Sequence, residues 1–137
     1  MMGTSWAAFS SDLPTDLIKA GVPISPLSLL EPVRLTEGLN AGIGMDAAEA
    51  KSESPMINHP PCTDAPQLVV VGGAETEEFH RQANMYVDAF RTRDRLIEMY
   101  EVPGVDHFDE LNTLAENSSE FFFKTIRLIH LTENLRN

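Results

Sequence analysis

The fold of this chain is decided by the stretch QLVVVGGAE, residues 67–75. The near-continuous apolar run that stops at two glycines is typical of a strand buried on both faces in a parallel sheet. An acidic residue, Glu75, follows the strand directly. Ligands and catalytic groups of open α/β sheets lie beyond the carboxyl ends of the strands, so Glu75 stands at a candidate site.

Downstream of this strand the sequence predicts a helix over residues 76–93. Its apolar stripe at helical spacing consists of Phe79, Ala83, Val87 and Phe90. Glutamates occupy the predicted first turn, and Arg91 and Arg93 the predicted last turn, which complements the helix dipole. A second strand is expected over residues 96–102. Strands and helices that alternate with short connections predict a parallel sheet with right-handed crossovers.

The segments before and after residues 67–102 show less regular patterns of apolar residues. A final helix is expected from a cap at Ser118 or Ser119 to about residue 131, and its predicted apolar stripe consists of Phe122, Ile126 and Ile129. Upstream, residues 17–24 read as a short buried strand, although Pro23 cannot donate to a ladder. Residues 25–66 read as a loop-rich, pocket-side insertion with one short helix that Asp46 can cap. The predicted fold class is therefore α/β, with about three parallel strands and flanking helices.

A histidine follows the second predicted strand in the stretch PGVDHF, residues 103–108. The carboxyl ends of adjacent parallel strands meet at one edge of a sheet, so we expect His107 to lie near Glu75. A carboxylate in contact with the imidazole can orient it and stabilise its charged form, as in a Ser-acid-His triad. The alternative is an acid at a helix N-terminus and a loop histidine that never meet.

Three stretches resemble one family. GGAETEEFHRQ (72–82) and VDHF (105–108) are similar to the C-terminal part of arylformamidase-type, or kynurenine formamidase-like, α/β-hydrolases. ISPLSLLEP (24–32) resembles that family's segment after the nucleophile helix, although Pro26 and Ser28 stand where glycine and aspartate are usual. The resemblance implies that Glu75 is the triad acid and His107 the general base, with Glu78 a weaker rival for the acid. It implies hydrolysis of a carboxylic ester or aryl formamide without a cofactor.

The same resemblance implies that residues 1–137 are a partial α/β-hydrolase domain. The N-terminal strands, the His-Gly-Gly oxyanion motif and the Gly-x-Ser-x-Gly nucleophile elbow are not found. Ser5 stands in a Gly-x-Ser-x-Ala stretch, but an elbow needs a strand before it. We therefore expect little or no activity from the chain alone. Two alternatives stay open: one piece of a split hydrolase completed by a serine-bearing partner, and a non-catalytic remnant that serves as an interaction module, associating through an exposed sheet edge.

The composition of the chain argues against several classes of partner and of binding site: nucleic acid, membranes, disulfides and metals. Ten basic and twenty-one acidic residues give a net charge of −11, which repels nucleic acid and anionic membrane surfaces. No apolar run reaches the roughly 20 residues that span a bilayer, and no signal-peptide core is apparent, so a cytoplasmic protein is expected. The single cysteine, Cys62, excludes an internal disulfide. The four histidines, His59, His80, His107 and His130, show no metal-ligand spacing, so no metal is expected.

Overall fold

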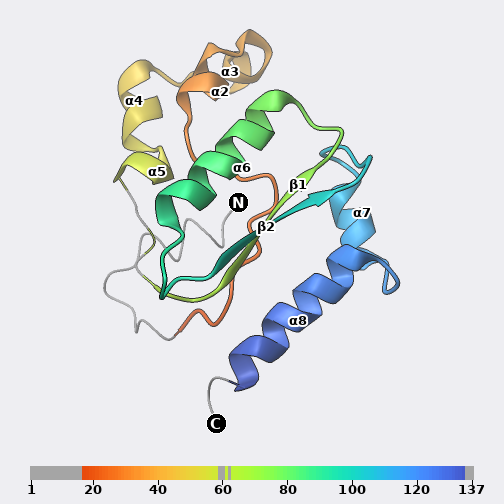
Figure 1. The fold of residues 1–137 in the computed structure, drawn as a ribbon. Coiled ribbons are helices and arrows are strands. Elements are labelled where there is room, and N and C mark those ends of the chain that lie inside the picture. The colour runs from red at the N-terminus through yellow and green to blue at the C-terminus, as the bar shows by residue number, and fades with distance from the viewer. Residues whose placement is uncertain (1–16, 59–60, 62, 135–137) are drawn as a thin grey trace.

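The computed structural model describes residues 17–58, 61 and 63–134. The sequence-based statements about Ser5, His59 and Cys62 lie outside the described residues. The fold is a mixed α/β arrangement around a small parallel sheet (Figure 1). The described elements, in chain order, are α2 (Glu31–Leu35), α3 (Glu37–Ile43), α4 (Ala47–Ser52), α5 (Pro55–Asn58), β1 (Gln67–Gly72), α6 (Glu77–Phe90), β2 (Ile97–Val102), α7 (Glu110–Ala115) and α8 (Glu120–Asn134).

The parallel sheet consists of β1 and β2, in register from Gln67 opposite Ile97 to Gly72 opposite Val102. Both strands lie where the sequence predicts them. Every residue of β1 is buried, because α6 covers one face of the sheet and α8 the other (Figure 1). Alternate side chains of β1 therefore enter two separate cores. Val69 and Val71 pack with α6, whereas Leu68 and Val70 pack with Phe121 of α8.

The segment 17–24 is not the third strand that the sequence predicts. It forms two isolated parallel bridges with β1, Gly21 opposite Gln67 and Ile24 opposite Val70, on the edge of β1 away from β2. Pro23 accepts a hydrogen bond from Val70 N–H but has no N–H of its own to donate. A residue with positive φ, Ser25 (φ 42°), then turns the chain away. The sheet thus has two strands and one bridged segment.

The region 25–66 is also more helical than expected. Four short helices, α2 to α5, replace the predicted loop with its single helix (Figure 1). Of these, α4 begins where predicted: Asp46 accepts hydrogen bonds from the backbone N–H groups of Ala48 and Glu49, both at 2.8 Å, and the Glu49 carboxylate accepts one from Asp46 N–H. Helices α2 and α3 have no side-chain cap, and Val33 is their single buried residue. Their sequences therefore lack the capping residue and the buried apolar stripe from which a helix is predicted.

The apolar stripe predicted for α6 is confirmed, because Ala83 and Val87 are buried and Phe79 and Phe90 pack against them. The ends of both long helices differ from the predicted ones, and α8 also buries a different face. Helix α6 ends at Phe90, so the arginines expected in its last turn lie beyond it; Arg91 instead donates to Ile97 O at 2.6 Å. Ser119 caps α8 by accepting from Phe122 N–H at 3.0 Å, as predicted. The predicted stripe of α8 is only partly right: Phe122 and Ile126 are half-buried, but Ile129 is 45% exposed, and the fully buried residue is Phe121.

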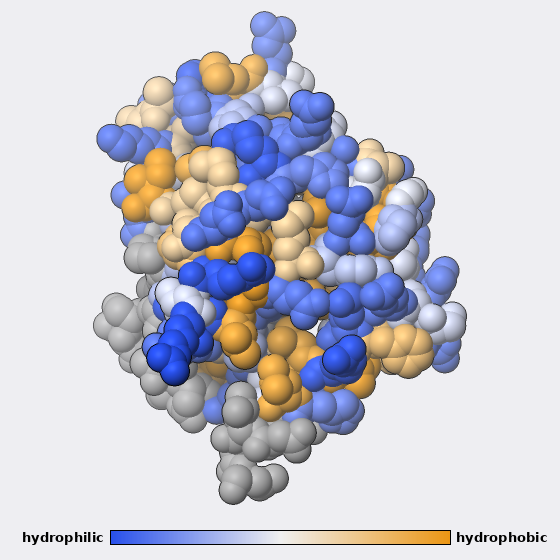
Figure 2. Space-filling view, viewed as in Figure 1, coloured by the Kyte–Doolittle hydropathy of each residue, from blue (hydrophilic) through white to orange (hydrophobic). Residues whose placement is uncertain are grey.

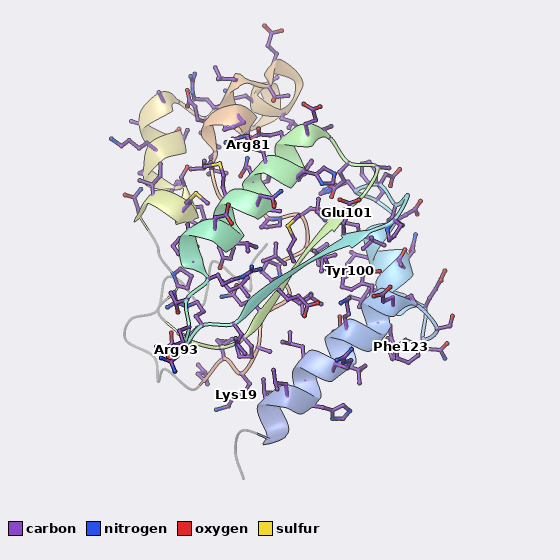
Figure 3. All side chains as sticks on the ribbon, viewed as in Figure 1. Lys19, Arg81, Arg93, Tyr100, Glu101 and Phe123 are labelled. Carbon is purple, nitrogen blue, oxygen red and sulfur yellow. The ribbon has the colours of Figure 1, made fainter. Side chains whose placement is uncertain are left out.

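Helix α8 meets the sheet through residues one position away from the predicted stripe. Phe121 and Leu128, seven residues apart, belong to the core under β1 and β2. Figure 3 shows Tyr100 between β2 and α8, and Phe123 on the outer side of α8. The rings of Tyr100 and Phe121 are 6.3 Å apart, and Lys124 Nζ lies 5.1 Å from the Tyr100 ring centroid. Apolar residues stand at neighbouring positions along α8, so the sequence alone does not show which of them face the sheet.

The face of the molecule seen in Figure 2 is mainly hydrophilic, with apolar side chains between polar ones. This agrees with the formal charge of −11. Within the described ranges, the longest helices are too short or too polar to cross a membrane.

Candidate functional site

The candidate site is built by two turns that follow the two strands. The turn after β1 carries Glu75, and the loop after β2 carries His107. These turns are bonded directly to each other: Gly73 N–H donates to Val102 O at 2.8 Å, and Ala74 N–H donates to Val105 O at 2.9 Å. A Cβ atom on Gly72 would lie 2.4 Å from Val105 O, so the close approach of the turns requires glycine there.

The structure brings the two sequence-predicted residues together. His107 Nδ1 lies 2.7 Å from Glu75 Oε1. The side chain of Glu75 is 1% exposed, whereas that of His107 is 48% exposed. The imidazole stacks on Phe79, with ring centroids 4.8 Å apart and planes inclined by 28°. A neutral imidazole that donates from Nδ1 to a carboxylate keeps Nε2 as its proton acceptor.

Glu78, the rival acid, points to other partners. Its carboxylate accepts hydrogen bonds from Arg81 at 2.6 and 2.7 Å and from the Gln82 amide at 2.9 Å. The bond from Arg81 lowers the pKa of Glu78 below its usual value. Asp106, beside the histidine, is likewise engaged: it accepts from the backbone N–H groups that follow His107 and so shapes the loop. Glu75 is therefore the acid that contacts His107.

Two residues of the site are missed by the sequence reasoning, Ser25 and Glu110. Ser25 Oγ lies 2.5 Å from Glu75 Oε2 and 2.9 Å from each carboxyl oxygen of Glu110. Both are deeply buried, with exposed fractions of 3% and 1%. Glu110 is the first residue of a short, unpredicted helix in an acidic stretch, where a glutamate is normally solvated. Ser25 lies in the family-like stretch 24–32, the one signal that pointed to this segment.

Burial has a clear electrostatic effect on Glu110. Desolvation raises the pKa of Glu110 to about 7, and the nearby Glu75 carboxylate adds to the rise. The hydrogen bond from Ser25 and the attraction of His107 act in the opposite direction but are weaker. A carboxyl group that is neutral near pH 7 can donate a hydrogen bond, which an ionised carboxylate cannot do.

Glu75, His107 and Glu110 also have the composition of a divalent-cation site, which the spacing of the histidines did not predict. One ligand atom from each lies within 4.8 Å of the others. Hydrogen bonds already engage these groups, because Ser25 bonds to both acids and His107 to Glu75. The arrangement is therefore explained by hydrogen bonding between the side chains.

A cavity of about 510 Å³ opens beside this cluster. Most of its wall is apolar, and the polar groups that line it include His107 and Glu110. The apolar lining includes Ile18, Val22, Ile24, Leu27, Tyr86 and Leu111. A concave apolar wall with a few convergent polar groups is the usual form of a small-molecule site. Among the described contacts of His107 there is no serine hydroxyl, since Ser25 bonds to the two acids instead.

Comparison with solved structures finds a similar protein. A protein from Silicibacter sp. TM1040, described as a "putative thioesterase", is 37% identical in sequence with a TM-score of 0.58. The match covers 75% of this chain and 37% of that protein, so the chain spans well under half the length of its structural neighbour. No protein-family model and no curated protein matches the sequence.

Proposed function

We propose that this chain supplies the acid and the histidine of a Ser-acid-His acyl hydrolase, as the C-terminal part of an α/β-hydrolase fold. The observation that carries the proposal is the contact of 2.7 Å between His107 Nδ1 and the buried Glu75 carboxylate, beyond the ends of adjacent parallel strands. The chain order, acid before histidine, is that of the α/β-hydrolases. The likeness to a protein described as a thioesterase and the resemblance to arylformamidases agree with this class of reaction.

In the proposed mechanism Glu75 fixes the ring and the tautomer of His107. His107 Nε2 takes the proton from a hydroxyl nucleophile as that hydroxyl attacks the acyl carbon, and returns it to the leaving group. The nucleophile comes from outside the described residues, either from another segment or from a partner chain. Loss of the serine from such a triad costs about 10⁶ in turnover, so the two groups alone give only slow hydrolysis.

The proposed substrate is a small acyl compound: a carboxylic ester, a thioester or an aryl formamide. Its apolar part would lie in the cavity of about 510 Å³, against residues such as Ile24, Leu27 and Tyr86. An apolar wall favours a hydrocarbon or aromatic group by removing its surface from water. The acyl carbon would then lie at the polar end, near His107.

Hydrolysis of activated esters by the full chain tests this proposal. We expect a slow release of 4-nitrophenol from 4-nitrophenyl acetate and butyrate that is abolished by His107→Ala. The matched control is His80→Ala, since His80 is a partly exposed histidine that also faces an acid, Glu101, at 3.6 Å. Equal rates for the two variants, both above the uncatalysed rate, would contradict the proposal. A comparison of acyl chain lengths then reports whether the cavity binds the acyl group.

A second candidate function is that of an association module, alone or in a split hydrolase. It is favoured by three exposed apolar side chains on α2 and α3: Leu35, Leu39 and Ile43 are 64%, 56% and 57% exposed. Exposed apolar residues that gather in one place often mark interaction sites. Replacement of the three by Ser distinguishes this function, because it would abolish self-association or co-purification of a serine-bearing chain without changing the His107-dependent rate.

A further inference from the structure

Ser25 occupies a conformation that side chains rarely adopt. Its φ of 42° lies in the left-handed region, where a residue with a Cβ atom is disfavoured. Its N–H donates to Val70 O at 2.8 Å, which fixes the turn against the buried strand β1. The turn aims the hydroxyl between Glu75 and Glu110, so the strained backbone places one hydroxyl between two carboxyl groups.

The hydrogens available in this contact can be counted. Ser25 has one hydroxyl hydrogen, yet its Oγ lies within 2.9 Å of three carboxyl oxygens belonging to the two acids. If both acids were ionised, the hydroxyl could satisfy one of them, and the other would face an oxygen lone pair at hydrogen-bond distance. One of the two acids therefore carries a proton, and the lone pairs of Ser25 Oγ can accept it.

The other contacts identify which acid is neutral. The Glu75 carboxylate accepts from Gly72 N–H at 2.8 Å, and it lies 2.7 Å from His107 Nδ1 and 2.5 Å from Ser25 Oγ. With His107 in the Nδ1–H tautomer, the ring is a second donor to Glu75. Convergent donors from the backbone and from an imidazole favour the ionised form of a carboxylate. Glu110, at the longer distance of 2.9 Å from Ser25, is then the acid that holds the proton.

We propose that Glu110 is a positioning residue for His107, and that it acts in its neutral form through a chain of three hydrogen bonds. The Glu110 carboxyl donates to Ser25 Oγ, the Ser25 hydroxyl donates to Glu75, and Glu75 accepts from Nδ1–H of His107. The chain orients the acid that orients the ring. In its catalytic meaning this inference rests on the proposed function, because it takes His107 as the general base.

The electrostatics of the cluster supports this assignment. The titratable groups that face Glu110 are Glu75, from the turn after β1, and His107, from the loop after β2. Burial raises the pKa of Glu110 to about 7, so its proton is present below that pH and is lost above it. The hydrogen-bond chain is therefore complete below about pH 7 and interrupted at higher pH.

NMR spectroscopy of the full chain tests the proposal without relying on activity. The ring N–H of His107 and the side-chain carboxyl carbons would be followed from pH 5 to pH 9 in the natural sequence, Glu110→Gln and Glu110→Ala. We expect one glutamate carboxyl to titrate near pH 7, and its resonance to vanish in both variants. We also expect Glu110→Gln to keep the hydrogen-bonded Nδ1–H resonance at pH 6 and pH 8, because the amide still donates to Ser25 but cannot ionise.

Glu110→Ala should lose that resonance or move it toward the value of a solvent-exposed imidazole. Glu101→Gln, which alters the acid that faces His80, serves as the control and should leave the His107 signal unchanged. The proposal is overturned if Glu110→Ala leaves the Nδ1–H resonance unaltered, if Glu110→Gln loses it, or if no glutamate titrates near pH 7. If a divalent cation restored the Nδ1–H resonance of His107 in Glu110→Ala, the proposal would also be overturned, in favour of a metal site.

The ester-hydrolysis assay separates failure of this inference from failure of the proposed function. If hydrolysis depends on His107 while Glu110→Ala leaves the ring resonance unaltered, the positioning role fails and the proposed function stands. If hydrolysis does not depend on His107 while the resonance behaves as expected, the hydrogen-bond chain stands and the catalytic function fails.

Discussion

His107 Nδ1 lies 2.7 Å from Glu75 Oε1, although the two residues are 32 positions apart in the chain. The contact follows from the register of the sheet, in which Gly72 pairs with Val102 and the two strands end level with each other. The two turns beyond these ends then need only be hydrogen-bonded to each other for the side chains to meet. Two strand ends of equal extent thus determine the geometry of the candidate site.

Replacement of Glu75 by Gln should remove most of the His107-dependent hydrolysis. A Gln side chain cannot hold the imidazole in the same tautomer by charge, and the corresponding change in a complete triad lowers turnover about 10⁴-fold. The matched variant is Glu78→Gln, which alters the rival acid while leaving Glu75 in place. Rates of 4-nitrophenyl acetate hydrolysis decide between them. A loss in Glu78→Gln but not in Glu75→Gln would identify Glu78 as the acid that supports His107.

The stability of the chain should fall as pH rises from about 4.5 to about 7. Over that interval Glu110 is ionised in the unfolded chain, where its usual pKa is 4.5, but stays protonated when folded, where burial raises its pKa to about 7. The folded state then binds more protons, so the free energy of unfolding decreases with pH and levels off above about pH 7. Urea unfolding at several pH values measures this slope. Glu110→Gln should flatten it, and an unchanged slope would contradict the assignment.

Gly72→Ala should destabilise the chain and separate the two turns. The added Cβ would lie 2.4 Å from Val105 O, a backbone atom that cannot rotate away. Overpacking of this kind costs about 1–3 kcal/mol. Gly38→Ala is the control, because its Cβ would meet nothing within 4 Å and alanine is the better helix former in α3. Thermal melting of both variants tests the difference, and equal melting temperatures would refute the close packing of the turns.

Phe121→Ala should cost about 3–5 kcal/mol of unfolding free energy, because a fully buried ring leaves a cavity under the sheet. Ile129→Ala, on the exposed side of the same helix, should change stability by less than about 0.5 kcal/mol. Denaturant titration of the two variants distinguishes the observed face of α8 from the one that the sequence stripe predicts. A larger loss for Ile129→Ala would restore the predicted face.

The sequence predicts β1 and α6 well, because each has a strong local pattern: the continuous run Val69–Val71 in β1, and the apolar stripe from Phe79 to Phe90 in α6. It places β2 correctly as well. It also predicts that Glu75 and His107 meet, since parallel strands place their ends together. It fails for α8 because apolar residues surround Phe121 on several sides and allow more than one stripe.

The remainder of the site could not be predicted from local patterns. The buried Glu110 side chain contacts Ser25, which lies 85 positions away in the chain. Nothing in an acidic helix start distinguishes such a residue from a solvated one. Likewise, the short helices α2 and α3 have few buried side chains and no side-chain caps, so their formation depends on neighbours far along the chain.

The hydrogen-bonded cluster joins three parts of the chain, because Ser25 lies 50 positions from Glu75 and 85 from Glu110. No local segment can form it by itself, and closing such wide loops is slow relative to helix formation. The Nδ1–H resonance of His107 would thus appear only when the last long-range contacts close, and would serve as a built-in indicator of complete folding.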